Sequence, residues 1–85
     1  MNKIEIMAQF ATSQDDTGST EVQCALLTNK INNLTIHLKK NKKDFQTRHG
    51  LIKMVVHRRR LLENLKKKDS SRYIALMTKL NLHKN

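Results

Sequence analysis

Apolar side chains recur every three or four residues along the stretch from Thr20 to Lys40. The apolar positions are Cys24, Leu27, Ile31, Leu34 and Leu38. On a helix, which turns once per 3.6 residues, this spacing forms one stripe about four turns long. The chain of 85 residues contains no proline and only two glycines, so few residues would interrupt a helix. The sequence therefore predicts an all-α protein.

Capping residues and charges mark where this helix should begin and end. Ser19 or Thr20 is the predicted start, and Thr20 with Gln23 fits a capping box. Glu21 suits the positive end of the helix dipole, and the two lysines before the polar turn at 41–43 suit its negative end.

Three further segments show a helical pattern. Asn2 with Glu5 predicts the start of a short first helix, Asp44 caps a third helix of about 22 residues, and 69–71 forms the cap of a fourth. Their apolar positions are Ile4, Met7, Ala8 and Ala11, then Leu51, Met54, Val55, Leu61, Leu62 and Leu65, then Tyr73, Ile74, Met77 and Leu80. Because short connections favour antiparallel neighbours, we expect a single helical domain over residues 1–85. Its last three helices should form an antiparallel bundle, with the short N-terminal helix docked least securely.

The charges are unevenly distributed along the chain. The formal net charge is +10 and the isoelectric point is about 10.2. Residues 1–29 carry one lysine against four acidic side chains, a net charge of −3, whereas residues 30–85 carry sixteen basic against three acidic side chains, a net charge of +13. A basic segment of this kind predicts a polyanionic partner, and it favours nucleic acid over an anionic membrane.

The sequence lacks the patterns of common catalytic and metal sites. Cys24 is the only cysteine, which excludes a disulfide within the chain and favours a small buried thiol. No two of the four histidines are three or four residues apart, and Gly18 belongs to no phosphate-binding glycine motif. We therefore expect no enzymatic activity, no metal and no cofactor. No apolar run reaches membrane-spanning length, and the first 11 residues lack a signal-peptide core, so a reducing aqueous compartment is expected.

One line of polar side chains on the second helix is a candidate binding surface. Gln23, Lys30 and His37 are seven residues apart, so they align about 50–90° around the helix from the apolar stripe. Thr17 and Gly18 precede the line, beside a helix N-terminus whose amides suit phosphate or ribose oxygens. A solvated helix flank and a simple capped turn are the alternative interpretations of these two features.

The third helix offers two further candidate groups. Asp44 and Thr47 flank its start, where Asp44 could serve as an N-cap alone or as a cap and a contact together. Arg58, Arg59 and Arg60 cannot all point outward, because successive residues are rotated by about 100°. At least one of these arginines should therefore lie along the core edge.

Longer runs of the sequence resemble one known family. The most specific run is Asp16-Thr17-Gly18-Ser19-Thr20-Glu21-Val22-Gln23, continued by Cys24-Ala25-Leu26-Leu27-Thr28. Further matches are His37-Leu38, Asn41-Lys42-Lys43-Asp44, Gly50-Leu51, Arg58-Arg59-Arg60-Leu61-Leu62, and Asp69, Arg72-Tyr73, Leu76 and Leu80-Asn81-Leu82. In this order, and over essentially the whole chain, they resemble the small-subunit ribosomal protein S15 of bacteria and organelles.

The resemblance implies a structural role in the small ribosomal subunit. It implies a four-helix protein that is monomeric when free and binds the central domain of the small-subunit ribosomal RNA early in assembly. Members of the family orient a three-way junction, bind a wobble-containing minor groove further along one arm, and prepare the RNA for the paired proteins six and eighteen. They also contribute to a bridge with large-subunit RNA. The implied location is the cytoplasmic ribosome, or an organellar one.

The resemblance also assigns roles to single positions. The matching junction positions are Thr17, Gly18 and Gln23, and the matching minor-groove positions are His37, Asp44 and Thr47. Long cations would contact the flanking phosphates, since duplex RNA is recognised mainly through its shape, phosphates and 2′-hydroxyls. The complete set predicted to bind RNA is Thr17, Gly18, Gln23, Lys30, His37, Asp44, Thr47, Arg58, Arg59, Arg60, Lys66 and Lys67.

Four positions depart from the family pattern. Thr47 replaces a usual serine and keeps its hydroxyl, and Lys30 replaces an arginine of some members, which keeps the charge but loses the planar fork. Asn64 replaces a usual tyrosine and His49 a usual arginine. These two changes remove an aromatic stacking group from the junction side and a charge from beside the minor-groove site.

Two other functions are compatible with the basic charge. A helix-turn-helix module could place the arginines 58–60 on DNA, although recognition helices present their N-terminal residues and these lie in mid-helix. A protein-only module could use the basic tracts for targeting. That module predicts a weak salt dependence of nucleic-acid binding, whereas several phosphate contacts predict a steep one.

Overall fold

Four helices make up the described part of the chain. The computed structural model describes residues 3–11 and 18–80. The helices are α1 (Lys3–Phe10), α2 (Thr20–Lys40), α3 (Phe45–Lys68) and α4 (Ser70–Lys79). Residues 3–11 and 18–80 contain no strand, which confirms the predicted all-α fold with four helices. None of these helices is long and apolar enough to cross a membrane.

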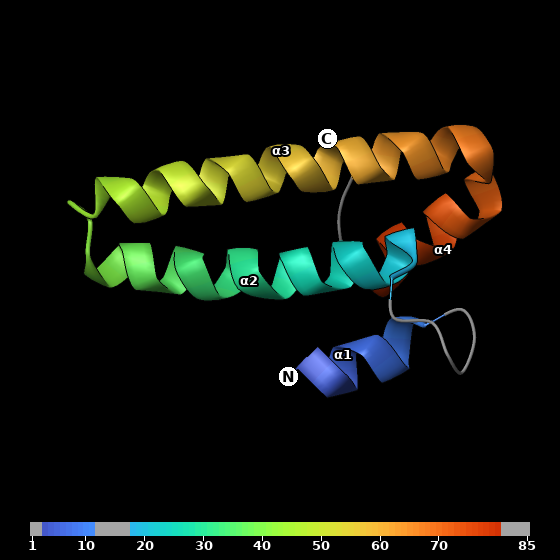
Figure 1. Ribbon diagram of the computed structural model, residues 1–85, viewed down its shortest axis with the longest axis horizontal. Coiled ribbons are helices and arrows are strands. Elements are labelled where there is room, and N and C mark those ends of the chain that lie inside the picture. Colours follow the sequence, from blue (N-terminus) through green and yellow to red (C-terminus); the bar gives the residue numbers. More distant parts are fainter. Residues whose placement is uncertain (1–2, 12–17, 81–85) are drawn as a thin grey trace.

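The two long helices set the shape of the molecule. α2 and α3 run antiparallel, and α4 turns back beneath the C-terminal end of α3 (Figure 1). α1 packs against the N-terminal half of α2, so the first helix is docked. The four helices gather at one end of a molecule that measures 40 × 28 × 18 Å. We call this the four-helix end, and we call the opposite end, residues 37–48, the hairpin tip; no other described helix covers the tip.

The apolar core lies at the four-helix end. Cys24, Leu65 and Leu76 are buried there, one each from α2, α3 and α4. The residues packed around them are Phe10, Leu61, Leu62, Tyr73 and Leu80. Burial raises the pKa of the Cys24 thiol to about 11, so this side chain is a neutral core residue, as the sequence indicated.

Not every residue of the apolar pattern in the short helices faces the core. Ile4 is 79% exposed and Ile74 is 62% exposed, whereas Tyr73 and Leu80 pack against the core. Ile6 and Leu76 are buried instead. α1 and α4 have only 8 and 10 residues, and each touches its neighbours along a narrow line. Ile4 and Ile74 are each two positions before the buried residue of their helix. They are therefore rotated from it by about 200° around the helix axis and lie in solvent.

Side chains cap the three later helices. Asp44 Oδ1 accepts the Thr47 amide at 3.0 Å, and Asp69 Oδ1 accepts the Arg72 amide at 3.2 Å, as the sequence predicted. At α2 the hydroxyl of Ser19 accepts an amide three residues later at 3.3 Å. Each cap satisfies one of the amides that a helix N-terminus leaves without a partner in the helix.

The predicted Thr20–Gln23 capping box is wrong. The cap lies one residue earlier, at Ser19, so Gln23 is the fourth helical residue rather than the third. Its side-chain amide instead donates to the Gly18 carbonyl oxygen at 2.8 Å. The predicted Asn2 cap of the first helix lies outside the described residues.

The three consecutive arginines of α3 have different environments. Arg58 Nη1 donates to Thr28 Oγ1 of α2 at 3.1 Å, and burial lowers the pKa of Arg58. Arg59 and Arg60 are exposed. The prediction that at least one arginine lies along the core edge is therefore confirmed, and Arg58 links the two long helices.

Replacing Thr28 with valine should destabilise the protein by about 1 kcal/mol, because the half-buried Arg58 guanidinium loses an acceptor. Urea unfolding followed by circular dichroism measures the change. Thr35→Val is the matched control: Thr35 is exposed on the same helix, and its hydroxyl donates only within α2, to the Ile31 carbonyl at 2.7 Å. Equal losses of stability in the two variants would contradict a stabilising role for the link between helices.

Candidate nucleic-acid interface

Three of the predicted site residues meet at the hairpin tip. His37 comes from the last turn of α2, Asp44 is the N-cap of α3, and Thr47 lies in the first turn of α3. His37 Nε2 lies 3.1 Å from Asp44 Oδ2, and Thr47 Oγ1 donates to the same oxygen at 2.6 Å. We call these residues the tip cluster. The tight turn after α2 brings side chains seven and ten residues apart into one hydrogen-bonded group.

The carboxylate of Asp44 organises the tip cluster. It caps α3 with Oδ1 and accepts two side chains with Oδ2. Hydrogen bonds from the Thr47 hydroxyl and amide, and then from His37, hold the pKa of Asp44 at about 2. Since an ionised carboxylate only accepts hydrogen bonds, the proton between His37 and Asp44 is carried by His37 Nε2. Asp44 is thus both a cap and a member of a polar surface group.

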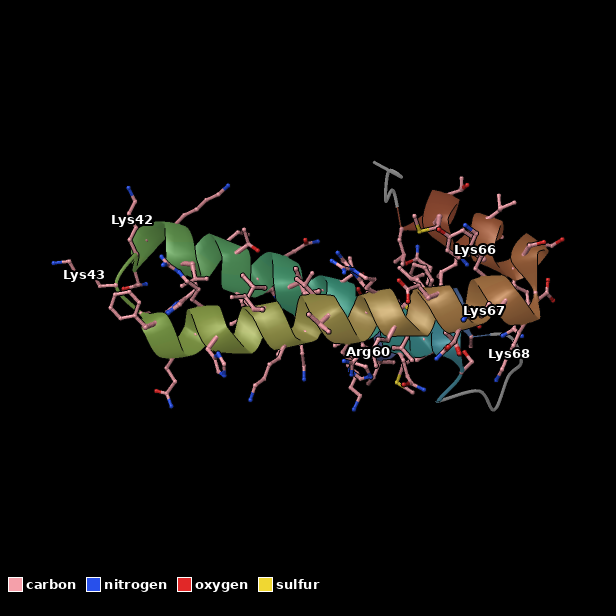
Figure 2. The ribbon with its side chains drawn as sticks, turned by 90° about the horizontal axis from the view of Figure 1, so that it is seen from above. Lys42, Lys43, Arg60, Lys66, Lys67 and Lys68 are labelled. Atoms are coloured by element: carbon pink, nitrogen blue, oxygen red, sulfur yellow. The ribbon has the colours of Figure 1, made fainter. Side chains whose placement is uncertain are left out.

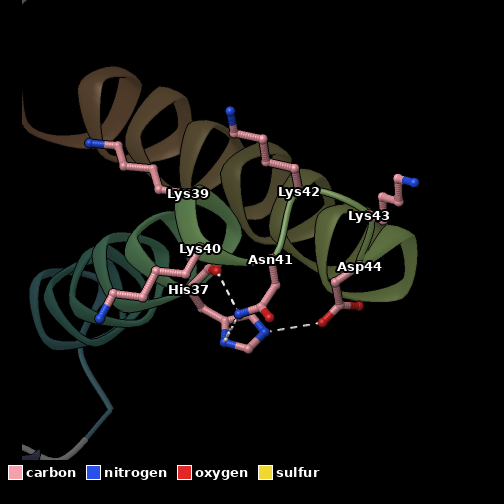
Figure 3. A pocket seen from close by; sticks show the side chains of 7 residues that line it. All are labelled: His37, Lys39, Lys40, Asn41, Lys42, Lys43 and Asp44. Carbon is pink, nitrogen blue, oxygen red and sulfur yellow. Dashed lines mark hydrogen bonds and ion pairs between the residues drawn. The ribbon is translucent and has the colours of Figure 1, made fainter.

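The amide of Asn41 holds His37 from the other side. Its Nδ2 donates to the His37 carbonyl oxygen at 3.1 Å and lies 3.5 Å from His37 Nδ1 (Figure 3). Nδ1 is thus the ring nitrogen that faces this amide, while Nε2 faces Asp44. Asn41 was not among the predicted site residues, although it lies within the Asn41–Asp44 run that resembles the family.

The depressed pKa of Asp44 makes part of the stability depend on pH. The carboxyl pKa is about 2 in the folded chain and 3.8 in its unperturbed form, so ionisation stabilises the fold above about pH 4. This contribution should decline as pH falls from about 4 to about 2. Asp44→Asn keeps a capping side chain without the charge. The difference in unfolding free energy between wild type and this variant should therefore be largest near neutral pH and become small near pH 2. A difference that is constant over this range would contradict the assignment.

Lysines surround the tip cluster. An open hollow of about 560 Å³ is lined by His37, Lys39, Lys40, Asn41, Lys42, Lys43 and Asp44. The four lysine side chains extend outward in different directions around the hydrogen-bonded residues (Figure 3). Arg48 adds a further cation, whose Nη2 donates to the Lys42 carbonyl at 3.0 Å and whose guanidinium carbon lies 5.6 Å from the centre of the exposed Phe45 ring. The imidazole of His37, the amide of Asn41 and the carboxylate of Asp44 thus lie inside a cationic rim. Arg48 was not among the predicted site residues, because its contact with the Lys42 carbonyl depends on the path of the turn.

The line of polar residues on α2 connects the two ends of the molecule. Gln23, Lys30 and His37 are all exposed, as their spacing predicted. Gly18, also exposed, lies at the four-helix end, where the Gln23 amide folds back onto its carbonyl. Thr17 lies outside the described residues.

Basic side chains also gather near the end of α3. Lys66, Lys67 and Lys68 lie at the four-helix end, Lys42 and Lys43 lie at the hairpin tip, and Arg60 lies between them (Figure 2). All six of these side chains are exposed. The ammonium of Lys66 lies 5.6 Å from the centre of the Tyr73 ring, which anchors it to α4. The described members of the predicted site therefore gather at the two ends of the molecule, with Lys30 and the arginines 58–60 between them.

The positions that depart from the family pattern are also on the surface. Asn64 is exposed on α3, one turn before Lys67 and Lys68, and His49 is exposed close to the tip cluster. Both therefore stand where the resemblance places an RNA contact, with side chains that offer less stacking area or charge than the usual residues.

Comparison with known proteins identifies the family. Residues 3–83 match the family model of ribosomal protein S15. A protein of Cupriavidus taiwanensis described as small ribosomal subunit protein uS15 is 56% identical over 84 residues, which cover 99% of this chain and 94% of that protein. The protein of the same description from Fusobacterium nucleatum is 58% identical over 82 residues, or 96% of each chain. The chain therefore belongs to the ribosomal protein S15 family, a structural family without enzymatic activity, as the sequence predicted.

Proposed function

We propose that this chain is a structural component of the small ribosomal subunit that binds ribosomal RNA at two separate features. The tip cluster carries the proposal, because His37, Asp44 and Thr47 form one hydrogen-bonded group on an uncovered end of the molecule. Family membership supplies the ribosomal context. We further propose that the chain acts as a single domain, is monomeric when free, and works in the cytoplasmic or an organellar ribosome.

The tip cluster suits the minor groove of an RNA helix. That groove is wide and shallow and displays 2′-hydroxyls and base edges, so short polar side chains reach it and long ones are not needed. The ionised Asp44 can accept a hydrogen bond from a 2′-hydroxyl or a base amino group, while Thr47 and His37 hold it in one orientation. The surrounding lysines suit the phosphates on either side of the groove. A wobble pair, which changes the pattern of groups in this groove, is the feature we assign to the tip.

The four-helix end suits the junction. Gly18 and Gln23 lie at the start of α2, and Lys66 and Lys67 lie at the end of α3. His37 is 14 positions beyond Gln23 on the same helix, a separation of about 21 Å at about 1.5 Å per residue. A rigid α2–α3 hairpin of this length can therefore fix the spacing between a junction and a groove on one of its arms. We propose Thr17 as a further junction contact, and Lys30 and the arginines 58–60 as sources of positive potential toward the intervening backbone.

The orientation of the junction gives the protein its proposed place in assembly. The protein would hold two RNA features at a fixed spacing. It would therefore stabilise one arrangement of the junction arms, because binding favours the RNA conformation that makes more contacts with the protein. We propose that this arrangement admits the paired proteins six and eighteen through the RNA, and that the exposed surface also contributes to a bridge with large-subunit RNA.

Footprinting on small-subunit RNA tests the proposed function. Hydroxyl-radical cleavage should be suppressed at a three-way junction and at a distal minor groove at the same protein concentration. Protection of one feature alone would contradict the two-site proposal. Preference for duplex DNA over a folded RNA junction at equal salt would favour the helix-turn-helix alternative, in which the mid-helix arginines contact DNA.

A further inference from the structure

A bidentate ion pair joins the first turns of α2 and α4. Arg72 Nε donates to Glu21 Oε2 at 2.7 Å, and Arg72 Nη2 donates to Glu21 Oε1 at 2.6 Å. The Glu21 side chain is only 12% exposed, and that of Arg72 is 44% exposed. Two parallel hydrogen bonds fix both the separation and the relative plane of a guanidinium and a carboxylate. Such a pair constrains geometry more than an exposed single contact does.

The pair lies beside the turn that carries the proposed junction contacts. Glu21 is followed by Val22, which is fully buried, and by Gln23, whose amide folds back onto the Gly18 carbonyl at 2.8 Å. The backbone from Gly18 to Gln23 is therefore anchored on one side by the core and on the other by Arg72. Without the pair, the core alone would hold this turn on the Arg72 side.

The helix that supplies Arg72 also contacts Lys66, another proposed junction residue. α4 follows the last turn of α3 directly, with Asp69 between them as a cap, and its Tyr73 ring faces the ammonium of Lys66. At its other end Lys79 donates to the carbonyl oxygen of Gln9 and lies over the Phe10 ring, which holds α1 in place. α4 is thus the element that connects the start of α2 to the basic end of α3.

We propose that the Arg72–Glu21 pair positions the first turn of α2 for junction binding, so that Arg72 acts as a positioning residue for the RNA interface without itself contacting RNA. The inference rests on the proposed function, because it explains how the residues proposed to bind the RNA junction are held in place. The hairpin tip contains neither α4 nor Glu21, so the pair should leave the minor-groove half unaffected.

Two variants with opposite changes in net charge test the inference. Arg72→Gln lowers the net charge by one and Glu21→Gln raises it by one, yet both remove the paired geometry. Both should weaken binding to an RNA that contains only the three-way junction by about tenfold, the loss expected when a charged hydrogen-bonded contact is misplaced. Both should bind an RNA helix that contains only the wobble site as wild type does, which also shows that each variant is folded. Arg72→Lys, which keeps the charge but not the planar fork, should retain only part of the junction affinity.

A matched variant and the salt dependence exclude the alternatives. Glu63→Gln removes an exposed carboxylate of α3 and should not weaken junction binding; a loss equal to that of Glu21→Gln would overturn the inference. The slope of log affinity against log salt should be the same for wild type and Arg72→Gln. A slope shallower by nearly one would instead show that Arg72 contacts a phosphate, and would overturn the positioning role. Equal losses on both RNAs would overturn it as well, since they would indicate general destabilisation.

The inference and the proposed function fail in different ways. If wild type prefers the junction RNA to a plain duplex but Arg72→Gln and Glu21→Gln bind it equally well, the positioning role is wrong and the proposed function stands. If wild type shows no preference for the junction, both are wrong.

Discussion

Replacing Asp44 with alanine should lower the affinity for an RNA helix containing the wobble site by about 10- to 100-fold, the range typical of a missing hydrogen bond to a charged group. The carboxylate accepts hydrogen bonds from the Thr47 hydroxyl at 2.6 Å and from His37 Nε2 at 3.1 Å. Its removal therefore deletes one proposed RNA contact and releases the two side chains beside it. The effect is measured by titrating, at equal salt, an RNA helix that contains the wobble site (matched) and an otherwise identical helix that lacks it (unmatched). Affinity for the unmatched helix should fall much less, because phosphate contacts from the neighbouring lysines remain.

Two controls separate recognition from helix capping. Asp44→Asn retains a capping oxygen for α3, so its thermal stability should exceed that of Asp44→Ala, while its RNA selectivity should still be reduced. Asp69→Ala removes the equivalent cap from α4 and should not change selectivity at the wobble site. If Asp44→Ala weakened the matched and unmatched helices by the same factor, Asp44 would be a cap alone.

The long helices could be predicted from the sequence because their apolar pattern is long enough to define one face. The stripe from Cys24 to Leu38 contains five positions, and Cys24 and Ile31 are buried as expected. α4 is much shorter, and two faces with different apolar residues fit its pattern equally well. The pattern used to predict this helix contained Ile74, which is exposed, and not Leu76, which is buried. Tyr73, Leu76 and Leu80 are also spaced by three and four residues, so the correct face was present in the sequence but was not distinguished by pattern alone.

Contacts between distant residues explain what the sequence could not predict. The capping role of Asp44 is local and was predicted, since it joins residues only three positions apart. The Arg72–Glu21 pair joins residues 51 positions apart and depends on how α4 packs beneath the end of α3. Local propensity carries no information about such a contact. For the same reason charge alone did not show that Arg58 faces α2 while Arg60 faces solvent.

The division of the charges has a physical consequence for recognition. Cations surround the hydrogen-bonding residues at the hairpin tip and gather again at the end of α3 (Figure 2). Contacts to phosphates supply affinity without information on sequence, whereas the tip cluster has only a few groups that could distinguish one RNA from another. Affinity and selectivity should therefore respond to different substitutions.

Replacing Lys66, Lys67 and Lys68 together with glutamine should weaken RNA binding on the order of 10²-fold at about 0.1 M salt. In the counterion-release relation, removing one phosphate contact changes the slope of log affinity against log salt by about 0.7 to 0.9. Lys67 and Lys68 are exposed, and Lys66 is partly engaged with the Tyr73 ring, so we expect the loss of about two phosphate contacts rather than three. The slope should then become shallower by about 1.4 to 1.8. RNAs that contain the three-way junction should lose affinity by the same factor whether or not they also contain the wobble site.

The triple variant contrasts directly with Asp44→Ala. The three lysines lie in the last turn of α3, where their positive charges interact favourably with the negative end of the helix dipole. Because this interaction is small at an exposed site, their removal should lower stability only modestly. The control is the double variant Lys3→Gln with Lys53→Gln, which removes two lysines elsewhere on the chain. Lys79 is left unchanged because it anchors α1. This double variant should reduce affinity less for each charge removed. If the lysine triple instead abolished binding to one RNA and spared another, these residues would be specific contacts, and selectivity would reside at both ends of the hairpin rather than chiefly at its tip.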